Sequence, residues 1–365
     1  MTSELSSFAA RVRESIRSGF PAENFGALAL ELFALQFAGN APYRKICEAR
    51  CVTPLTANNW TQIPAVPTAA FKELELSCLP IAERTAVFHS SGTTEQRPSR
   101  HFHNAESLAV YEASLWSWFA ENLQFPIGDL RLLCLTPPPV QAPNSSLVHM
   151  FDVIRQKLGA ETSAFVGRAG PGGVWELSGA ATVNQLRSAG ERGQPLLLLG
   201  TAFSFVHLLD LLGEQNLSIR LPSGSRVLET GGYKGRSRTL PKAELHALIT
   251  ERLGVPAAHI VCEYGMSELS SQAYDFEVRS GECGVPNPSR AFRFPPWARG
   301  QIISPETGCE LADGETGLIR VFDLANIFSV LAVQTEDLAV RRRDGFELIG
   351  RAALSEPRGC SLMAV

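Results

Sequence analysis

The sequence predicts an α/β fold in which a mostly parallel sheet is flanked by helices and followed by a smaller β subdomain. Two observations support this prediction. Strand-like and helix-like segments alternate from about residue 84, and short strands with turns replace them after about residue 285. Such alternation favours parallel strands, because each helix returns the chain across the sheet. The length of 365 residues also exceeds what one small core usually supports.

The individual elements follow from hydrophobic spacing along the chain. The first 40 residues are expected to form two amphipathic helices, the second within ENFGALALELFALQFA. The strands expected after them are RTAVF, RLLCLT, SAFVG, PLLLLG, SRVLET and HIVCEYG. The helices expected between these strands are SLAVYEASLWSWFAENL, SSLVHMFDVIRQKLG, ATVNQLRSAGERG, FSFVHLLDLLGEQ and PKAELHALITERLG. The later short strands are GQIISPETG, TGLIRVFDLAN and EDLAVRRRDGFELIG.

Composition disfavours several classes of protein. The net charge of −4 gives no sign of a nucleic-acid partner. The eight cysteines include no CxxC pair, which argues against zinc-ribbon or thioredoxin-type chemistry. The N-terminus lacks the apolar core of a signal peptide, and the longest apolar stretch, PLLLLG, is too short to span a bilayer. We therefore expect a soluble, reduced, cytoplasmic protein without a membrane span.

The segment HSSGTTEQRPSRH, residues 89–101, is typical of a loop that binds a polyphosphate. Hydroxyl and backbone N–H groups surround Gly92, which lets a ligand approach the backbone closely. Arg97, Arg100 and His101 add donors nearby. No GK[ST] follows, so this is not a Walker A loop, and no GxSxG elbow indicates a serine hydrolase. A polar surface turn is the alternative for this loop taken alone.

Later segments place further polar residues directly after expected strands. ETGGYKGRSR begins at the end of SRVLE, and CEYGMSELSSQAYD follows HIV. TEDLAV and LIGRAAL lie in the last part of the chain. Open α/β sheets usually bind ligands at the carboxyl ends of their strands, so Tyr264, Gly232 and Asp337 are expected to line one cleft.

Together these segments resemble the ANL superfamily of adenylate-forming enzymes, and within it the LuxE-type acyl-protein synthetases. SSGTT resembles the phosphate-binding loop, and EYGMSE resembles the YGxTE motif with Ser267 in place of threonine. Asp337 matches the ribose-binding aspartate, and Gly350-Arg351 matches the end of the large domain. The closer LuxE resemblance rests on APNSSL, GTAFSFVHLLD, GGYKGRSR and RGCSL, and the matches span the chain from about residue 60 to its end.

The resemblance implies an ANL-type large N-terminal domain in three parts. Residues 1–284 would form the α/β adenylate-forming domain with its N-terminal helices, 285–352 a β subdomain closing the nucleotide site, and 353–365 a terminal arm. The small mobile C-terminal domain of the superfamily would be absent. That domain supplies a lysine in most relatives, so the catalytic cation would come from a partner or from Lys234, Arg236 or Arg100.

The resemblance further implies activation of a carboxylic acid, a fatty acid by family likeness, as acyl-AMP with ATP and Mg²⁺. The residues expected to hold the leaving phosphates are Ser90, Ser91, Gly92, Thr93 and Thr94. Ser267 would bind the α-phosphate and Glu268 would be the catalytic metal ligand. The nucleotide would be completed by Tyr264 stacking on adenine, by Asp337 accepting from the ribose hydroxyls, and by Gly231, Gly232, Gly265 and Arg351.

Three of these residues could instead have purely structural roles. Tyr264 is otherwise a core aromatic, Glu268 a surface helix residue and Asp337 a turn former. The sequence also departs from the family, because Glu95 stands where most members have glycine. A carboxylate beside a triphosphate is unfavourable unless it points away or helps to hold Mg²⁺.

The resemblance implies that Cys360, in RGCSL, accepts the acyl group as a thioester and passes it to an acceptor such as an acyl reductase. Pro357 and Gly359 disfavour a helix around it, and Arg358 favours the reactive thiolate. A frayed tail with a spectator cysteine is the alternative. Two other functions stay open: a ligase that loads a carrier protein or coenzyme A, and an inactive nucleotide-binding scaffold.

Overall fold

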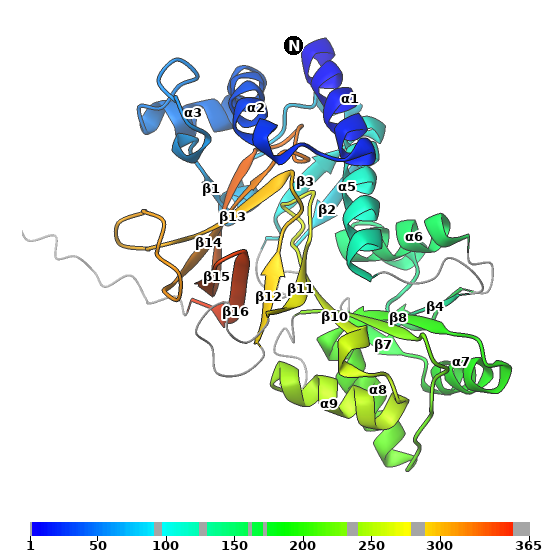
Figure 1. Ribbon diagram of the computed structural model, residues 1–365. Helices are drawn as coiled ribbons and strands as arrows, with labels where there is room; N and C mark the ends of the chain where they lie inside the picture. Colours follow the sequence, from blue (N-terminus) through cyan, green and yellow to red (C-terminus); the bar gives the residue numbers. More distant parts are fainter. Residues whose placement is uncertain are drawn as a thin grey trace, which may run out of the picture.

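The computed structural model describes residues 2–90, 97–123, 130–159, 163–170, 174–231, 240–278 and 289–352. These residues form a mixed α/β fold around one large sheet (Figure 1). One half of the sheet is parallel. Its strands are β4 (Arg131–Cys134), β5 (Ala164–Phe165), β8 (Leu196–Thr201), β9 (Arg226–Thr230) and β10 (Ile260–Tyr264). They lie in the order β5-β4-β8-β9-β10, as expected for repeated β-α units.

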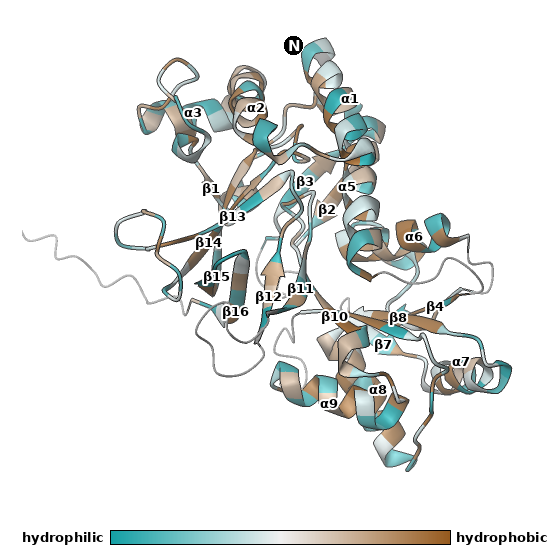
Figure 2. Ribbon diagram, viewed as in Figure 1, coloured by the Kyte–Doolittle hydropathy of each residue, from teal (hydrophilic) through white to brown (hydrophobic). Residues whose placement is uncertain are grey.

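Helices cover both faces of this parallel half. On one side lie α5 (Ala105–Leu123) and α6 (Ser146–Leu158), and on the other α7 (Gly179–Arg192), α8 (Ala202–Glu214) and α9 (Lys242–Leu253) (Figure 1). In β8, Leu197 and Leu199 join the core that contains α5 and α6, whereas Leu196 and Leu198 join the other core. Figure 2 shows β4 and β8 as apolar ribbons between these helices. A strand covered on both faces reads as a continuous apolar run for this reason.

The second half of the sheet is antiparallel. Its strands are β11 (Ala273–Val278), β12 (Ser289–Arg293), β13 (Ala298–Ile303), β14 (Thr316–Asp323), β15 (Ala332–Arg342) and β16 (Gly345–Arg351). They continue from β10 in the order β11-β12-β16-β15-β14-β13, and β1 (Val66–Pro67) pairs with β15. The strand direction therefore changes between β10 and β11. The boundaries at residues 284 and 352 stay predictions.

The N-terminal helices pack near the antiparallel half. They are α1 (Thr2–Ser18), α2 (Phe25–Gly39), α3 (Ala41–Ala49) and the short α4 (Ala70–Glu73). Buried Gln36 fixes α2 to the β14–β15 connection, because its amide nitrogen donates to the carbonyls of Asn326 and Ile327. Its amide oxygen accepts from the Leu331 backbone N–H at 2.7 Å. The two helices predicted in the first 40 residues are thus present as α1 and α2. Short 3₁₀ turns are η1 (Ala22–Asn24), η2 (Trp60–Gln62), η3 (Ile81–Glu83), η4 (Pro139–Gln141) and η6 (Ala257–His259).

One predicted strand lies outside the large sheet. The RTAVF segment contributes β2 (Ala86–His89), which pairs antiparallel with β3 (Arg100–His103) in a separate hairpin. The prediction that this strand opens the parallel series was therefore wrong. The loop between β2 and β3 is too short for the helical crossover that parallel strands need. A second hairpin, β6 (Gly167–Ala169) with β7 (Trp175–Leu177), was not predicted.

A helix that crosses a bilayer needs about 20 consecutive, mostly apolar residues. Within the described ranges, no helix is both long enough and apolar enough to cross a membrane.

Candidate functional site

The predicted site residues follow two adjacent parallel strands. Gly231 comes directly after β9, and Gly265 directly after β10. The two strands pair in parallel register, so both residues lie at the same edge of the sheet. A Cβ built on Gly231 would meet no atom within 4 Å, so the space beside its backbone is open. This edge is where open α/β sheets usually bind ligands.

Three side chains form a serine–glutamate cluster just beyond β10: Ser99, Ser267 and Glu268. The Ser99 hydroxyl donates to Glu268 Oε1 at 2.5 Å, and the Ser267 hydroxyl donates to Glu268 Oε2 at 3.0 Å. The two serine oxygens are 3.4 Å apart. All three residues are buried, with Glu268 only 5% exposed. Glu268 is therefore not the surface helix residue that the alternative interpretation allowed.

Two neighbours hold the backbone of this cluster in place. His101 Nδ1 lies 2.7 Å from the Ser267 carbonyl oxygen, so this nitrogen carries the proton and donates. Burial lowers the pKa of His101 to about 4, which leaves the ring neutral at neutral pH. The Asn326 amide donates to the Glu268 carbonyl at 3.0 Å. His101, expected to be a phosphate donor, is instead used to position Ser267.

The Glu268 carboxylate has the chemistry of a Mg²⁺ ligand. Each of its oxygens accepts one serine hydrogen bond and retains further lone-pair capacity. Mg²⁺ usually binds one or two carboxylates together with phosphate oxygens and waters, so one carboxylate suffices. Among the described residues there is no group of three or more His, Cys, Asp or Glu side chains that would hold a metal by themselves. The residues present fit a Mg²⁺ ion that arrives with a polyphosphate.

Tyr264, Asp337 and Arg351 form a second group, the tyrosine–aspartate cluster. The Tyr264 hydroxyl donates to Asp337 Oδ2 at 2.8 Å, and Arg351 Nε donates to Asp337 Oδ1 at 3.1 Å. Asp337 and Arg351 are directly opposite each other on β15 and β16. A register shift two residues away marks a β-bulge, the kind of irregularity that re-aims side chains near functional sites.

The Tyr264 ring packs against three phenylalanines. Its centroid lies 5.4 Å from that of Phe346, 6.0 Å from Phe292 and 6.2 Å from Phe294. Only 7% of the residue is exposed. Burial and the Asp337 carboxylate both raise the pKa of Tyr264, which therefore stays protonated and able to donate. Stacking on adenine stays a prediction, and the contacts present are those of a core aromatic with a polar tip.

The remaining predicted residues divide into two groups. Ser90 closes the base of its loop: its N–H donates to the Ser99 carbonyl at 3.3 Å, and its hydroxyl oxygen accepts from the Ser99 N–H at 3.0 Å. Outside the described residues lie Ser91, Gly92, Thr93, Thr94, Glu95, Gly232, Lys234, Arg236 and Cys360. Hydrogen bonds through Ser99 thus connect Ser90, at the start of the predicted phosphate loop, to Glu268.

Arg100 and Arg97 already have carboxylate partners. Arg100 Nη1 lies 3.3 Å from Glu75 Oε1, and Arg97 Nη1 lies 3.9 Å from Glu73 Oε2. Arg100 would have to exchange its partner to act on a phosphate, so its catalytic role stays a prediction.

Ser99 is the site residue that sequence reasoning missed. It stands between Pro98 and Arg100, and no motif distinguishes it from the other serines. The β2–β3 hairpin brings it to Glu268, which is 169 positions away in the chain. A contact at that separation has no local signal.

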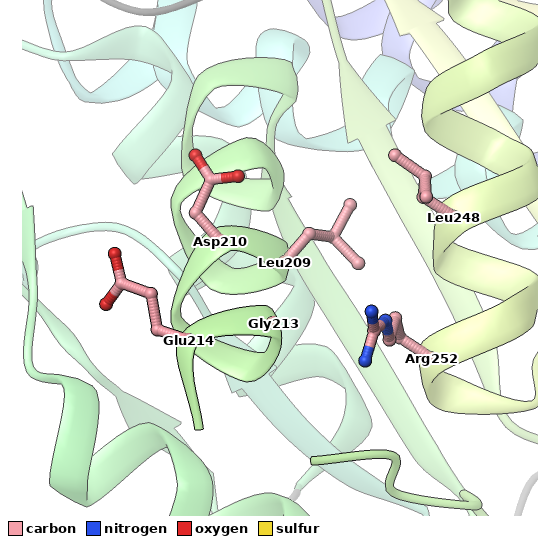
Figure 3. A pocket seen from close by; sticks show the side chains of 6 residues that line it. All are labelled: Leu209, Asp210, Gly213, Glu214, Leu248 and Arg252. Atoms are coloured by element: carbon pink, nitrogen blue, oxygen red, sulfur yellow. The ribbon is translucent and has the colours of Figure 1, made fainter. Parts of the chain in front are cut away.

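A surface pocket elsewhere contains no predicted site residue. It lies between α8 and α9, where Leu209 and Leu248 point toward each other (Figure 3). Its other lining residues are Asp210, Gly213, Glu214 and Arg252. These residues lie in the carboxyl-terminal halves of α8 and α9, near the amino-terminal ends of the parallel strands. The pocket is therefore at the edge of the sheet opposite to the clusters described above.

A CoA ligase is among the solved structures that share this fold. An open conformation of 2-hydroxyisobutyryl-CoA ligase, in complex with 2-HIB-AMP and CoA, matches with a TM-score of 0.65 and 15% identity, covering 91% of this chain and 71% of that chain. The same ligase in its thioesterification state matches with a TM-score of 0.67 and 14% identity, covering 93% and 70%. This chain and that ligase therefore share a fold.

The family assignment is more specific. The family model "Acyl-protein synthetase, LuxE" matches residues 22–364, so the chain belongs to the LuxE acyl-protein synthetase family. A relative from Aliivibrio fischeri, a long-chain-fatty-acid–luciferin-component ligase, is 21% identical over 357 residues, which cover 92% of this chain and 86% of the relative. The predicted family and fold are confirmed, and the enzyme class is that of acid–thiol ligases.

Proposed function

We propose that this enzyme activates a carboxylic acid with ATP, as acyl-AMP, and transfers the acyl group to a thiol. One observation carries the proposal: the five-residue stretch 264–268 joins the tyrosine–aspartate cluster to the serine–glutamate cluster. A nucleotide placed along this stretch would meet Asp337 at one end and Glu268 at the other. A fatty acid is the first candidate substrate, because the Aliivibrio fischeri relative is a long-chain-fatty-acid ligase by name.

The first step would be attack of a carboxylate oxygen on the α-phosphorus of ATP. A new P–O bond forms, the α–β phosphoanhydride bond breaks and pyrophosphate leaves. Ser267 would turn its single hydroxyl proton from Glu268 to the α-phosphate, while Ser99 keeps its hydrogen bond to Glu268 and holds the carboxylate in place. Mg²⁺, when bound, would neutralise charge on the phosphates. The chain's part in this step is positioning and electrostatic stabilisation.

The second step would use Cys360, which lies outside the described residues. Its thiolate would attack the acyl carbonyl carbon, and the bond from that carbon to the AMP oxygen would break to give a thioester and AMP. A partner acceptor, such as an acyl reductase, would then take the acyl group. A carrier protein or coenzyme A is the alternative acceptor, and it would require no thioester on the chain.

Two measurements test this proposal. ATP–pyrophosphate exchange with a panel of acids tests acid activation. If no acid supports exchange, the activation proposal fails and the alternative of an inactive nucleotide-binding scaffold is favoured. Intact mass after incubation with Mg-ATP and the best acid tests thioester formation. We expect Cys360→Ser to keep exchange and lose a hydroxylamine-sensitive acyl adduct. Cys309→Ser, at an exposed cysteine, is the matched control. An adduct that persists in Cys360→Ser would assign the thiol elsewhere.

A further inference from the structure

Neighbouring residues at the end of β10 face opposite sides of the sheet. Tyr264 faces Asp337 and the phenylalanines, and Lys242 of α9 lies 4.7 Å above the Phe292 ring on that side. Glu263 must point the other way because side chains alternate along a strand. It lies directly opposite Tyr274 of β11 and therefore shares its face. Figure 1 shows α5 and α9 on opposite sides of these strands.

The Glu263 carboxyl group is buried beside the nucleotide edge. The residue is 7% exposed, and its Oε1 would be only 2.3 Å from a Cβ placed on Gly265. The carboxyl oxygen therefore lies against the turn that connects the two clusters. Burial raises the pKa of Glu263 to about 8, and the negative charge of Glu229 is the second, smaller cause. In the described part of the chain, no cationic side chain pairs with it.

Three further residues lie near Glu263, and with it we call them the Glu263 group: Tyr111, Gln272 and Tyr274. The charge of Glu263 acts on both tyrosines, and Gln272 Cγ would be 3.5 Å from the same Cβ placed on Gly265. Among the described residues, the buried Tyr274 hydroxyl and the Gln272 side-chain oxygen have no hydrogen-bond partner. Within the same residues, the Tyr111 hydroxyl makes one long contact, 3.4 Å, to the Ser146 carbonyl. Burial raises the pKa of both tyrosines, and the charge of Glu263 adds to it.

We propose that the Glu263 group binds a hydrogen-bond donor, an amino or hydroxyl group, carried by the acyl part of the acid substrate. This inference rests on the proposed function. The proposed function places the nucleotide on the Tyr264 face, so the acid would occupy the opposite face of the same strand end. Both ligands would then meet at the turn where Ser267 and Glu268 stand.

The chemistry of the group favours a donor over an alkyl chain. The two phenolic oxygens and the amide oxygen accept hydrogen bonds, and Glu263 becomes a further acceptor when it is ionised. A plain hydrocarbon would leave these buried atoms unpaired, which is the main reason that sites built for polar groups reject apolar analogues. An ammonium group would in addition lower the raised pKa of Glu263, and the ionised carboxylate and the ammonium would then balance each other's charge.

The test is ATP–pyrophosphate exchange with matched acids. Each straight-chain acid is compared with the same chain bearing an amino or a hydroxyl group, over short to long chains. We expect the substituted acids to be preferred by at least about 10-fold in kcat/KM. Glu263→Gln should remove the preference for amino-substituted acids and largely spare that for hydroxyl-substituted ones. Tyr274→Phe, which deletes one oxygen, should weaken either preference.

Controls separate this inference from the proposed function. Tyr43→Phe removes a buried hydroxyl that donates to the Pro64 carbonyl at 3.0 Å, far from this site, and should leave acid preference unchanged. The inference would be overturned if plain fatty acids were used as well as or better than substituted ones and if Glu263→Gln and Tyr274→Phe left this preference unchanged. That result would still support acid activation. Exchange with no acid at all would overturn both.

Discussion

The two carboxylates of the site, Glu268 and Asp337, are held in different ways. Glu268 is 5% exposed, and its described side-chain partners are two serine hydroxyls. Asp337 accepts from a tyrosine hydroxyl and from the guanidinium of Arg351. In the described part of the chain, Asp337 therefore has a cationic partner and Glu268 has none.

This difference bears on what each carboxylate can bind. A buried carboxylate without a cation is costly, because hydroxyl groups replace only part of its hydration. Binding of a metal cation would compensate Glu268 directly. Asp337 is already compensated by Arg351, so it is suited to accept from neutral hydroxyl groups such as those of ribose. The same side-chain chemistry is thus expected to have two roles, one in charge balance and one in recognition.

The largest effect is expected for Glu268→Gln. Glutamine keeps the size of the side chain but loses the charged oxygen that a metal ligand supplies. We expect kcat for pyrophosphate exchange to fall at least about 100-fold, with an unchanged far-ultraviolet circular dichroism spectrum. Exchange at the wild-type rate under saturating Mg²⁺ would remove Glu268 from the metal site.

The second effect concerns the support of the same cluster by His101. Its pKa is lowered from 6.5 to about 4 by burial, so the unfolded chain binds a proton that the folded chain does not between these values. The contribution of His101 to the free energy of unfolding is therefore fully present above pH 6.5, and it is lost as the pH decreases toward 4. The His101 share of this loss is about 3 kcal/mol.

The variant His101→Gln isolates that share. Burial also lowers the pKa of His103 and His89, so some pH dependence should remain in the variant. Urea unfolding at a series of pH values should show a shallower loss than in the wild type. Identical slopes for the two proteins would show that His101 is not buried in the neutral form.

A smaller effect is expected for Asp337→Asn in the recognition cluster. Asparagine retains one acceptor but loses the charge that holds Arg351, so binding of the nucleotide should weaken in ground and transition states alike. We expect KM for ATP to rise about 10-fold while kcat changes by less than about threefold. A fall in kcat with constant KM would instead place Asp337 among groups that act in the transition state.

The smallest effect is expected for Tyr264→Phe. The substitution removes the hydroxyl bond to Asp337 but leaves the ring contacts with Phe292, Phe294 and Phe346. Thermal and urea unfolding should show a loss of about 1 kcal/mol, because Asp337 retains Arg351. A rise in KM for ATP as large as that of Asp337→Asn would mean that the hydroxyl, rather than the carboxylate, dominates recognition.

Local patterns were sufficient for most of the fold. The continuous apolar run PLLLLG predicted a strand buried on both faces, and β8 has that environment. The helix predicted from PKAELHALITERLG is α9, with Leu245 and Ile249 in the core. RTAVF was misassigned to the parallel sheet because its composition predicts that it forms a strand but does not predict which strand it pairs with. Only the following segment, RHFH, decides that β2 forms a hairpin.

The candidate site was determined by sequence only in part. Resemblance to the motifs of the ANL superfamily, which occur here in the expected order, selected Ser267, Glu268, Tyr264 and Asp337 as candidates. Tertiary structure alone brought Ser99 to Glu268 and Arg351 opposite Asp337, because those contacts join residues distant in the chain or depend on strand register. It also separated Glu263 from Tyr264. The two are consecutive in sequence, yet the alternation of side chains along β10 places them on opposite faces of the sheet.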